Sequence, residues 1–432
     1  MKNYDQLVKY KGNSDLFRAI EMSITALSND IPLHIHAEGV RGTGKTTIMR
    51  SVKEMLPPIL RIKNCIYNCH PEKPHCPEHR HLSSEKIGSI GTEVVPCPFL
   101  EISHAAKIGT VIGSIDLGKL TSHDRGMAAI LPGTIPQAHR GVIFIDEINR
   151  LADVSPEVAD VLLDVMGTKP GHVQIEETGL PTVELPVSVA IWAASNPDEE
   201  PGPLNLIRKQ LADRFDFSIC MERPKEYTAV FNILAQRTQQ IEIDLDYREK
   251  NRVGDLGAIM IEDHIRNMIA KIYVDFNLES LRSIETMELS ASLSCLMAGR
   301  QRVEITDLIN IVPFALNHRV DKESIEQILN YLECGKVKSH INLPVQELLS
   351  SNKIEKIIWW KNILNNLYQK MNFLNKYKSP IKSQMVGSKN DGMPAGNLKM
   401  MDPAKTDFIA PPHKALAMRE LPVEEFIKHG EQ

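Results

Sequence analysis

The sequence lacks any apolar run that approaches the roughly 20 residues of a membrane-spanning helix. It also lacks an excess of positive charge, because 50 Lys and Arg residues stand against 55 Asp and Glu residues. The formal net charge of -5 therefore gives no reason to expect nucleic-acid binding by bulk electrostatics. The first residues, 1–6, contain no apolar core of a signal peptide. We expect a cytoplasmic protein with neither a membrane nor a nucleic acid as its partner.

At 432 residues the chain exceeds a typical domain, so two or three domains are expected. Its hydrophobic content of 42% and charged content of 24% are ordinary for a globular protein. In a reducing cytoplasm, its seven cysteines are expected to be thiols or metal ligands and not disulfides.

Residues 39–46 read G-V-R-G-T-G-K-T, the pattern of a phosphate-binding loop. An apolar stretch at 32–37 predicts a strand before the loop, and 47–56 predicts a helix after it. Glycines let successive backbone N–H groups point inward, and the helix N-terminus adds partial positive charge. Lys45 is expected to reach the β- and γ-phosphates of ATP as part of catalysis, and Thr46 to hold Mg²⁺. The expected nucleotide-binding residues here are Gly39, Gly42, Thr43, Gly44, Lys45, Thr46 and Thr47.

Residues 141–147, G-V-I-F-I-D-E, predict a buried parallel strand that ends in two carboxylates. In a doubly wound sheet, that carboxyl edge is where ligands bind. We expect Asp146 to hold Mg²⁺ through water and Glu147 to orient and polarise the attacking water. Phosphoryl transfer depends mainly on positioning and charge neutralisation, so these acids complement Lys45 and Thr46.

Three further polar residues are candidates for the nucleotide site. Asn196 follows the predicted strand 187–194, where it could touch the γ-phosphate, although an Asn-Pro pair also starts turns. Arg214 precedes an aromatic residue and could reach a neighbouring subunit's γ-phosphate as an arginine finger, or pair with Asp213. Arg282 begins a later helix and could close onto the nucleotide from a lid, or be solvated.

Taken together, these residues resemble the ATPase subunit of magnesium chelatase, a member of the AAA+ superfamily near the MoxR-type ATPases. The resemblance covers about residues 10–320. The segments that carry it are 39–46, 112–117, 137–142, 141–149, 160–165, 195–197, 210–215, 281–282, 299–303 and 316–319.

The resemblance implies a hexameric ring with ATP bound between subunits. It implies that Arg214 is the arginine finger acting in trans, Asn196 the first sensor and Arg282 the second sensor. It also implies a β-hairpin at 173–186, and a partner that carries a von Willebrand A domain. In the chelatase itself a third subunit binds porphyrin, and Mg²⁺ is inserted into protoporphyrin IX.

The expected fold class is α/β: a P-loop AAA+ αβα sandwich with a parallel sheet, followed by an all-α domain. We expect a nucleotide-binding core at 1–222, with an irregular Cys/His-rich insertion at 61–98. A helical lid at 223–335 follows, with a single helix over 255–276 among its elements. A further helical segment at 336–378 and an extended, flexible tail at 379–432 complete the chain.

The insertion contains four cysteines interleaved with histidines. Four thiols could close a tetrahedral zinc site or hold an iron–sulfur cluster, and the neighbouring imidazoles favour zinc slightly. The alternative is a surface insertion with free thiols. The candidate ligands are Cys65, Cys69, Cys76 and Cys97.

The leading functional hypothesis is an ATP-hydrolysing motor subunit of a magnesium-chelatase-like complex that inserts a metal into a tetrapyrrole. A MoxR-type chaperone ring that loads a metal or cofactor into a partner enzyme is the nearest alternative. A slow ATP-dependent regulator or scaffold is an alternative of another class, disfavoured because a scaffold needs neither Glu147 nor Arg214. A DNA-remodelling motor is disfavoured by the acidic charge balance.

Overall fold

The computed structural model describes residues 4–115, 130–176, 182–235 and 254–341. The chain divides into two units, Met1–Pro344 and Val345–Gln432, and the second lies wholly outside the described residues. The predicted tail at 379–432, and all but the first residues of the predicted segment 336–378, therefore also lie outside them. Everything below concerns the first unit.

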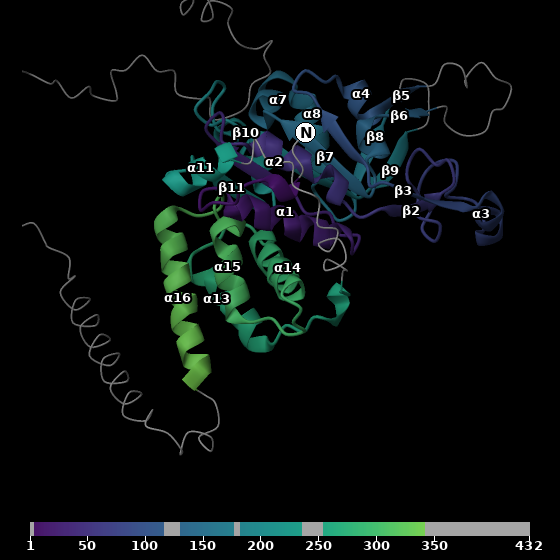
Figure 1. Cartoon of the computed structure of the whole chain (residues 1–432). Coiled ribbons are helices and arrows are strands. Elements are labelled where there is room, and N and C mark those ends of the chain that lie inside the picture. The colour runs from purple at the N-terminus through teal and green to yellow at the C-terminus, as the bar shows by residue number, and fades with distance from the viewer. Residues whose placement is uncertain (1–3, 116–129, 177–181, 236–253, 342–432) are drawn as a thin grey trace, which may run out of the picture. The chain divides into compact units, whose positions relative to one another are not determined.

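A five-stranded parallel sheet in the order β11-β1-β10-β7-β4 forms the centre of the α/β core (Figure 1). Since all strands run the same way, their carboxyl ends meet at one edge, as the motif analysis required. The strands are β1 Ile35–Gly39, β4 Phe99–Ile102, β7 Gly141–Asp146, β10 Val189–Ser195 and β11 Phe217–Met221.

The strands are apolar on both faces because both faces are covered. In β7, Val142 and Phe144 belong to one hydrophobic cluster, while Ile143 and Ile145 belong to a second cluster on the other side. This alternation is the period of two that a strand imposes on its side chains. The first cluster includes residues of α1 and of the lid, and the second includes residues of α7 and α8.

The helices and turns of the core connect these strands. Helix α1 buries Leu16 and Ile20, as its helical spacing predicts. The core elements are η1 Tyr4–Gln6, α1 Ser14–Leu27, α2 Lys45–Ser51, η2 Val52–Met55, α4 Ile108–Ile112, α6 Thr134–Gln137, α7 Ile148–Val154, α8 Pro156–Val165, α9 Leu204–Ile207 and α10 Lys209–Asp213. Helix α11 Tyr227–Ala235 follows the last strand and lies in the range expected for the helical lid.

Within the described residues, three two-stranded antiparallel sheets accompany the core: β2–β3, β5–β6 and the hairpin β8–β9. The expected hairpin at 173–186 is present, although its turn lies outside the described residues. The expectation that 61–98 is irregular is wrong, because β2, α3 and β3 lie in or overlap this range. Helix α3 forms because the Ser83 side chain caps it, and it ends at Gly91, whose φ is 86°. The bounds are β2 Ile59–Ile62, α3 Ser84–Ile90, β3 Thr92–Val95, β5 Gly113–Ile115, β6 Ile130–Pro132, β8 Gly171–Ile175 and β9 Val183–Val187.

The lid is helical, as predicted, but the expected helix over 255–276 is shorter. It begins only at Asp263, because Met260 pairs with the backbone of Gln301 and Val303 in an extended bridge. The lid elements are η3 Leu256–Ala258, α13 Asp263–Asp275, α14 Arg282–Met297, α15 Ile305–Ala315 and α16 Lys322–Ile341. Among the described residues, no helix has the length and apolarity needed to span a membrane.

Two buried histidines of the core predict a loss of stability in acid. Burial lowers the pKa of His34 and of His36 to about 4 each, against about 6.5 in an unfolded chain. Between these values the unfolded state binds more protons, so the free energy of unfolding falls as pH falls through this window. We expect a loss of about 2 kcal/mol per histidine between pH 7 and pH 5, measured by urea denaturation. The His34→Gln variant should show a flatter pH dependence, and the variant His172→Gln, altered at an exposed residue, should not.

Candidate ATP-binding site

The phosphate loop follows β1 at the carboxyl edge of the sheet. Gly42 and Gly44 have φ values of 81° and 89°, a region that favours glycine, and a Cβ on either would meet no atom within 4 Å. Gly39 is needed for another reason: a Cβ there would lie 2.6 Å from the carbonyl oxygen of Met221. The loop thus packs closely against β11 while leaving an open cradle lined by backbone.

Lys45 is the first residue of α2 and points back into the loop. Its Nζ donates to the carbonyl oxygens of Gly39 at 2.6 Å and Val40 at 3.0 Å, and to Oδ1 of Asn196 at 2.9 Å. Burial lowers the pKa of Lys45, while nearby carboxylates, Asp146 first among them, act to raise it. The ammonium is therefore held where phosphate oxygens would need a counter-charge.

Thr46 and Asp146 converge from two different elements. Thr46 Oγ1 lies 3.2 Å from each carboxylate oxygen of Asp146, although the two residues are 100 positions apart. A hydroxyl and a carboxylate are oxygen ligands of the kind that Mg²⁺ takes beside a nucleotide. The donor set thus fits Mg²⁺ with the phosphates of ATP.

Glu147 follows β7 with φ 56°, a left-handed conformation that is uncommon outside glycine. Such backbone strain persists where surrounding structure enforces it, often at functional sites. The Glu147 carboxylate lies 3.1 Å from Arg150, which also lies 3.3 Å from Glu199. Arg150 was missed from the sequence, although its spacing of three residues on α7 could have indicated this pair.

Asn196 follows β10, and its side chain accepts the hydrogen bond from Lys45 described above. A hydrogen bond also holds Ser195, the residue before Asn196, because its Oγ lies 2.8 Å from Nε2 of the buried His36. Asn149 on α7 donates to the carbonyl oxygens of Asn196 and Gly202. The polar residues predicted for the phosphate end are therefore brought together at one edge: Lys45, Thr46, Asp146, Glu147 and Asn196.

Arg214 lies at the opposite edge of the sheet. It directly follows α10 and precedes β11, and its Nη1 lies 3.5 Å from the carbonyl oxygen of Gly167. The alternative of an ion pair with Asp213 is wrong, because Asp213 pairs with Arg319 at 3.6 Å. The neighbouring strand β1 spans the distance between the two edges of the sheet. From His34 to the phosphate loop it extends over five residues, which is about 16 Å at 3.3 Å per residue. Arg214 is thus remote from the phosphate loop of its own chain.

Arg282, at the start of α14, lies beside Arg214. Its Nη2 donates to the same carbonyl oxygen of Gly167 at 2.8 Å, and its Nη1 to that of Met166 at 3.3 Å. Since α8 ends just before these carbonyls, Arg282 also lies at the amino edge of the sheet. The idea that this arginine closes onto a nucleotide in its own chain's loop does not fit this position.

The two arginines line a cleft of about 1290 Å³ between core and lid. Lys169 and Lys209 add further positive charge, and Asp216 lies at its buried end. The pKa of Asp216 is lowered even though burial acts to raise it, because Lys169, His34 and Arg319 surround the carboxylate. Lys169 pairs with Asp216 and Lys209 with Glu279, so the cleft contains both cations and carboxylates, at the edge of the sheet that does not carry the phosphate loop.

The structure brings together three of the four predicted cysteines, and it places the fourth elsewhere. Cys65, Cys69 and Cys76 converge with His79, and their ligand atoms lie within 4.8 Å of one another. Cys97 lies elsewhere: its Sγ is directed at the carbonyl oxygens of Pro98 and Arg140. The cause is that Cys97 stands just before β4 and is drawn into the hydrophobic cluster of the sheet.

Comparison with known proteins finds similarity to subunits of magnesium chelatase. The family model for magnesium chelatase, subunit ChlI, matches residues 7–212, and that for an AAA lid domain matches 266–330. The 38 kDa magnesium-chelatase subunit of Acidiphilium rubrum is 27% identical over 68% of this chain and 85% of its own length. Subunit ChlI of Euglena gracilis is 29% identical over 67% of this chain and 84% of its own length. A chain in the complex of magnesium-chelatase subunits BchI and BchD has 23% identity and a TM-score of 0.43, covering 76% of this chain and 98% of that one.

The parallel sheet with its phosphate loop, followed by a helical lid, defines a P-loop protein of the AAA+ class. Within that class, the chain resembles the ATPase subunit of magnesium chelatase.

Proposed function

We propose that this protein binds Mg-ATP and hydrolyses it at sites completed by a second copy of the chain. The observation that carries the proposal is the division of the predicted residues between two edges of one sheet. Lys45, Thr46, Asp146, Glu147 and Asn196 share the carboxyl edge, whereas Arg214 and Arg282 share the amino edge.

At the carboxyl edge the residues have separate roles. The backbone of 39–46 cradles the phosphates, with Thr43 and Thr47 in and directly after the loop. Lys45 neutralises phosphate charge, and Thr46 with Asp146 holds Mg²⁺. ATP and Mg²⁺ supply the phosphoryl group and the charge that stabilises its transfer. Glu147 accepts a proton from the attacking water, and Asn196 positions that water or the γ-phosphate.

The amino edge is proposed to serve the neighbour. An arginine near a transferred phosphoryl group stabilises the charge that develops there. Arg214 as the finger and Arg282 as the second sensor would both reach the nucleotide held by an adjacent subunit. A head-to-tail arrangement of this kind closes into a ring, for which we propose a hexamer.

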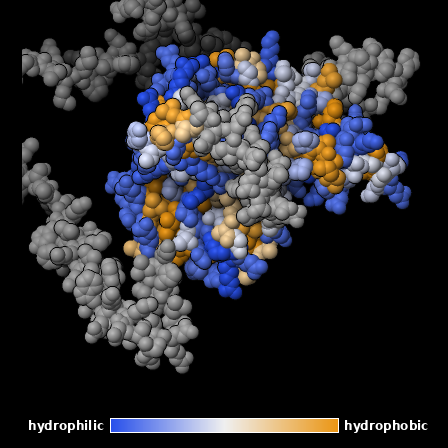
Figure 2. All heavy atoms as spheres, in the orientation of Figure 1, coloured by the Kyte–Doolittle hydropathy of each residue, from blue (hydrophilic) through white to orange (hydrophobic). Residues whose placement is uncertain are grey.

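The surface is compatible with assembly. Figure 2 shows a mostly hydrophilic face that is interrupted by apolar patches. Helix α11 exposes Tyr227, Phe231 and Leu234, and apolar groups gathered at a surface are typical of interaction sites.

We further propose that the ring is the motor of a magnesium-chelatase-like complex in the cytoplasm, with a von Willebrand A partner and a tetrapyrrole substrate. The resemblance in sequence to named magnesium-chelatase subunits supports this. Stimulation by a von Willebrand A protein without any porphyrin-binding subunit would instead support a MoxR-type chaperone.

The test of ring-dependent hydrolysis is the ATPase rate per chain measured across a range of protein concentrations. We expect the specific activity to rise with concentration and then reach a plateau, because each site needs residues from two chains. Light scattering on the same samples should show assembly over the same range. A rate per chain that is constant while the protein dissociates would contradict the proposal and favour a self-contained, slow regulator.

A further inference from the structure

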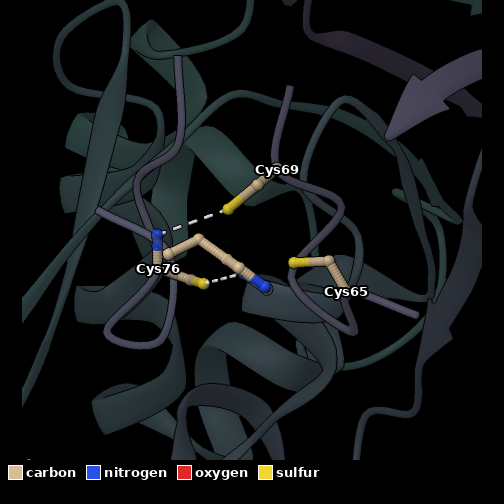
Figure 3. A group of neighbouring side chains, drawn as sticks. Cys65, Cys69 and Cys76 are labelled. Atoms are coloured by element: carbon tan, nitrogen blue, oxygen red, sulfur yellow. Dashed lines mark hydrogen bonds between the residues drawn. The ribbon is translucent and has the colours of Figure 1, made fainter. Parts of the chain in front are cut away.

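We propose that Cys65, Cys69, Cys76 and His79 form a structural zinc site in the insertion between β2 and β4. All four residues are buried, and each offers one ligand atom within 4.8 Å of the others. Figure 3 shows the sulfur atoms of the three cysteines turned toward one shared space. In a tetrahedral site with Zn–S bonds of about 2.3 Å, neighbouring sulfurs lie about 3.8 Å apart. The observed spread is close enough to this value for the four side chains to enclose one ion.

The backbone builds the site from two short turns. The amide N–H of Cys65 donates to the carbonyl oxygen of Ile62, and the amide N–H of Asn68 donates to the carbonyl oxygen of Cys65. In the second turn, the N–H groups of His79 and Arg80 both donate to the carbonyl oxygen of Cys76. A tight turn between two ligands is a recurring way to present them on one side of a metal.

The sulfur of Cys69 is held by several hydrogen-bonding contacts. It accepts hydrogen bonds from the backbone N–H groups of His75 and Cys76, both at 3.4 Å, and it lies 3.2 Å from Nδ1 of His75. Figure 3 shows the hydrogen bond from the Cys76 N–H to this sulfur. Donors of this kind around a ligand fix its orientation and stabilise the negative charge of a metal-bound sulfur.

The donor set selects the metal. Three thiolates and one imidazole form the Cys₃His combination of structural zinc sites, which are closed and four-coordinate. Iron–sulfur clusters of the usual kinds need four cysteines, or two cysteines with two histidines. Because Cys97 is directed elsewhere, the described residues around this site supply neither set. The geometry thus favours zinc.

The role of the ion follows from what the loop contacts. The Asn68 side chain donates a hydrogen bond to the carbonyl oxygen of Gln137 at 2.7 Å. The ring centroids of His75 and His139 lie 3.9 Å apart. Gln137 and His139 precede β7, the strand that carries Asp146 and Glu147. We infer that zinc holds the insertion in place against the segment that leads into the acidic strand.

The test is metal analysis of the full-length protein, purified without chelators. We expect about one zinc per chain, with iron absent, since structural zinc binds tightly at neutral pH. Cys76→Ser should lower the zinc content at least about tenfold. Cys97→Ser is the matched control, because it removes a buried thiol of the same insertion, and it should keep full zinc. Equal zinc loss in Cys76→Ser and Cys97→Ser would overturn the ligand assignment.

A second variant guards against loss of folding. His79→Cys keeps four ligands and should retain about one zinc per chain. After exchange of zinc for cobalt, this variant should show stronger thiolate-to-cobalt absorption than the wild-type protein, since a fourth sulfur has joined the ion. Identical cobalt spectra would remove His79 from the site. Wild-type protein that stays free of zinc after incubation with zinc chloride under reducing conditions would overturn the proposal, and iron in place of zinc would do the same.

Discussion

Replacing Glu147 with glutamine is expected to lower ATP turnover by at least about 10²-fold, the usual contribution of a general base. The amide cannot accept a proton from the attacking water, although its size leaves the contact with Arg150 possible. ATP binding should change little, because the phosphate contacts come from the loop and Lys45. The measurements are steady-state ATP hydrolysis and binding of a fluorescent ATP analogue.

A glutamate at an exposed position of α8 provides the matched control. Glu157→Gln makes the same chemical change at an exposed residue in the first turn of that helix, and should retain the wild-type rate. If Glu147→Gln hydrolyses ATP as fast as Glu157→Gln, the proton-accepting role belongs to another residue.

Replacing Arg214 with alanine is expected to lower ring-dependent hydrolysis by about 10³-fold, the lower end of what an arginine finger contributes. The reason is that Arg214 is proposed to stabilise charge on the nucleotide bound by the adjacent subunit, and not on the nucleotide bound by its own subunit. ATP affinity of the dissociated subunit should therefore be unchanged. Rates at a concentration where the ring is assembled, and binding at a concentration where it is not, separate the two effects.

The exposed lid residue Arg266 provides the matched control, because replacing it with alanine also removes one positive charge. It pairs with Glu288 on the surface at 3.1 Å, and Arg266→Ala should retain normal turnover. Full activity of Arg214→Ala in assembled rings would show that this arginine is not the finger.

The carboxyl edge of the sheet could be predicted from sequence because its signals are local. A glycine loop between a strand and a helix, and an apolar run ending in Asp146 and Glu147, each define both their structure and their place at the edge of a parallel sheet. The contact of Thr46 with Asp146 then follows from topology alone.

The position of Arg282 could not be predicted in this way. A first-turn arginine on a lid helix can lie at either edge of the sheet, and only the packing of α14 against the end of α8 decides. The start of α13 was missed for a similar reason, since the extended bridge at Met260 depends on a distant strand-like segment near Arg302.

The fourth ligand of the cysteine site shows a different failure. Residue type alone groups Cys97 with the other thiols, whereas its position two residues before β4 places it in the sheet's hydrophobic cluster. The signal in the sequence for His79 is the spacing of two residues between it and Cys76, because such a turn can direct both side chains to one ion.

The most direct test of the central claim mixes two inactive variants. Lys45→Ala has no working phosphate loop but keeps Arg214, and Arg214→Ala keeps the loop but lacks the arginine. In mixed rings, the loop of the Arg214→Ala chain can face the arginine of the Lys45→Ala chain. We expect the mixture to regain a substantial fraction of wild-type ATP hydrolysis, rising with total protein concentration. A mixture that assembles and remains as inactive as either variant alone would contradict sites shared between subunits.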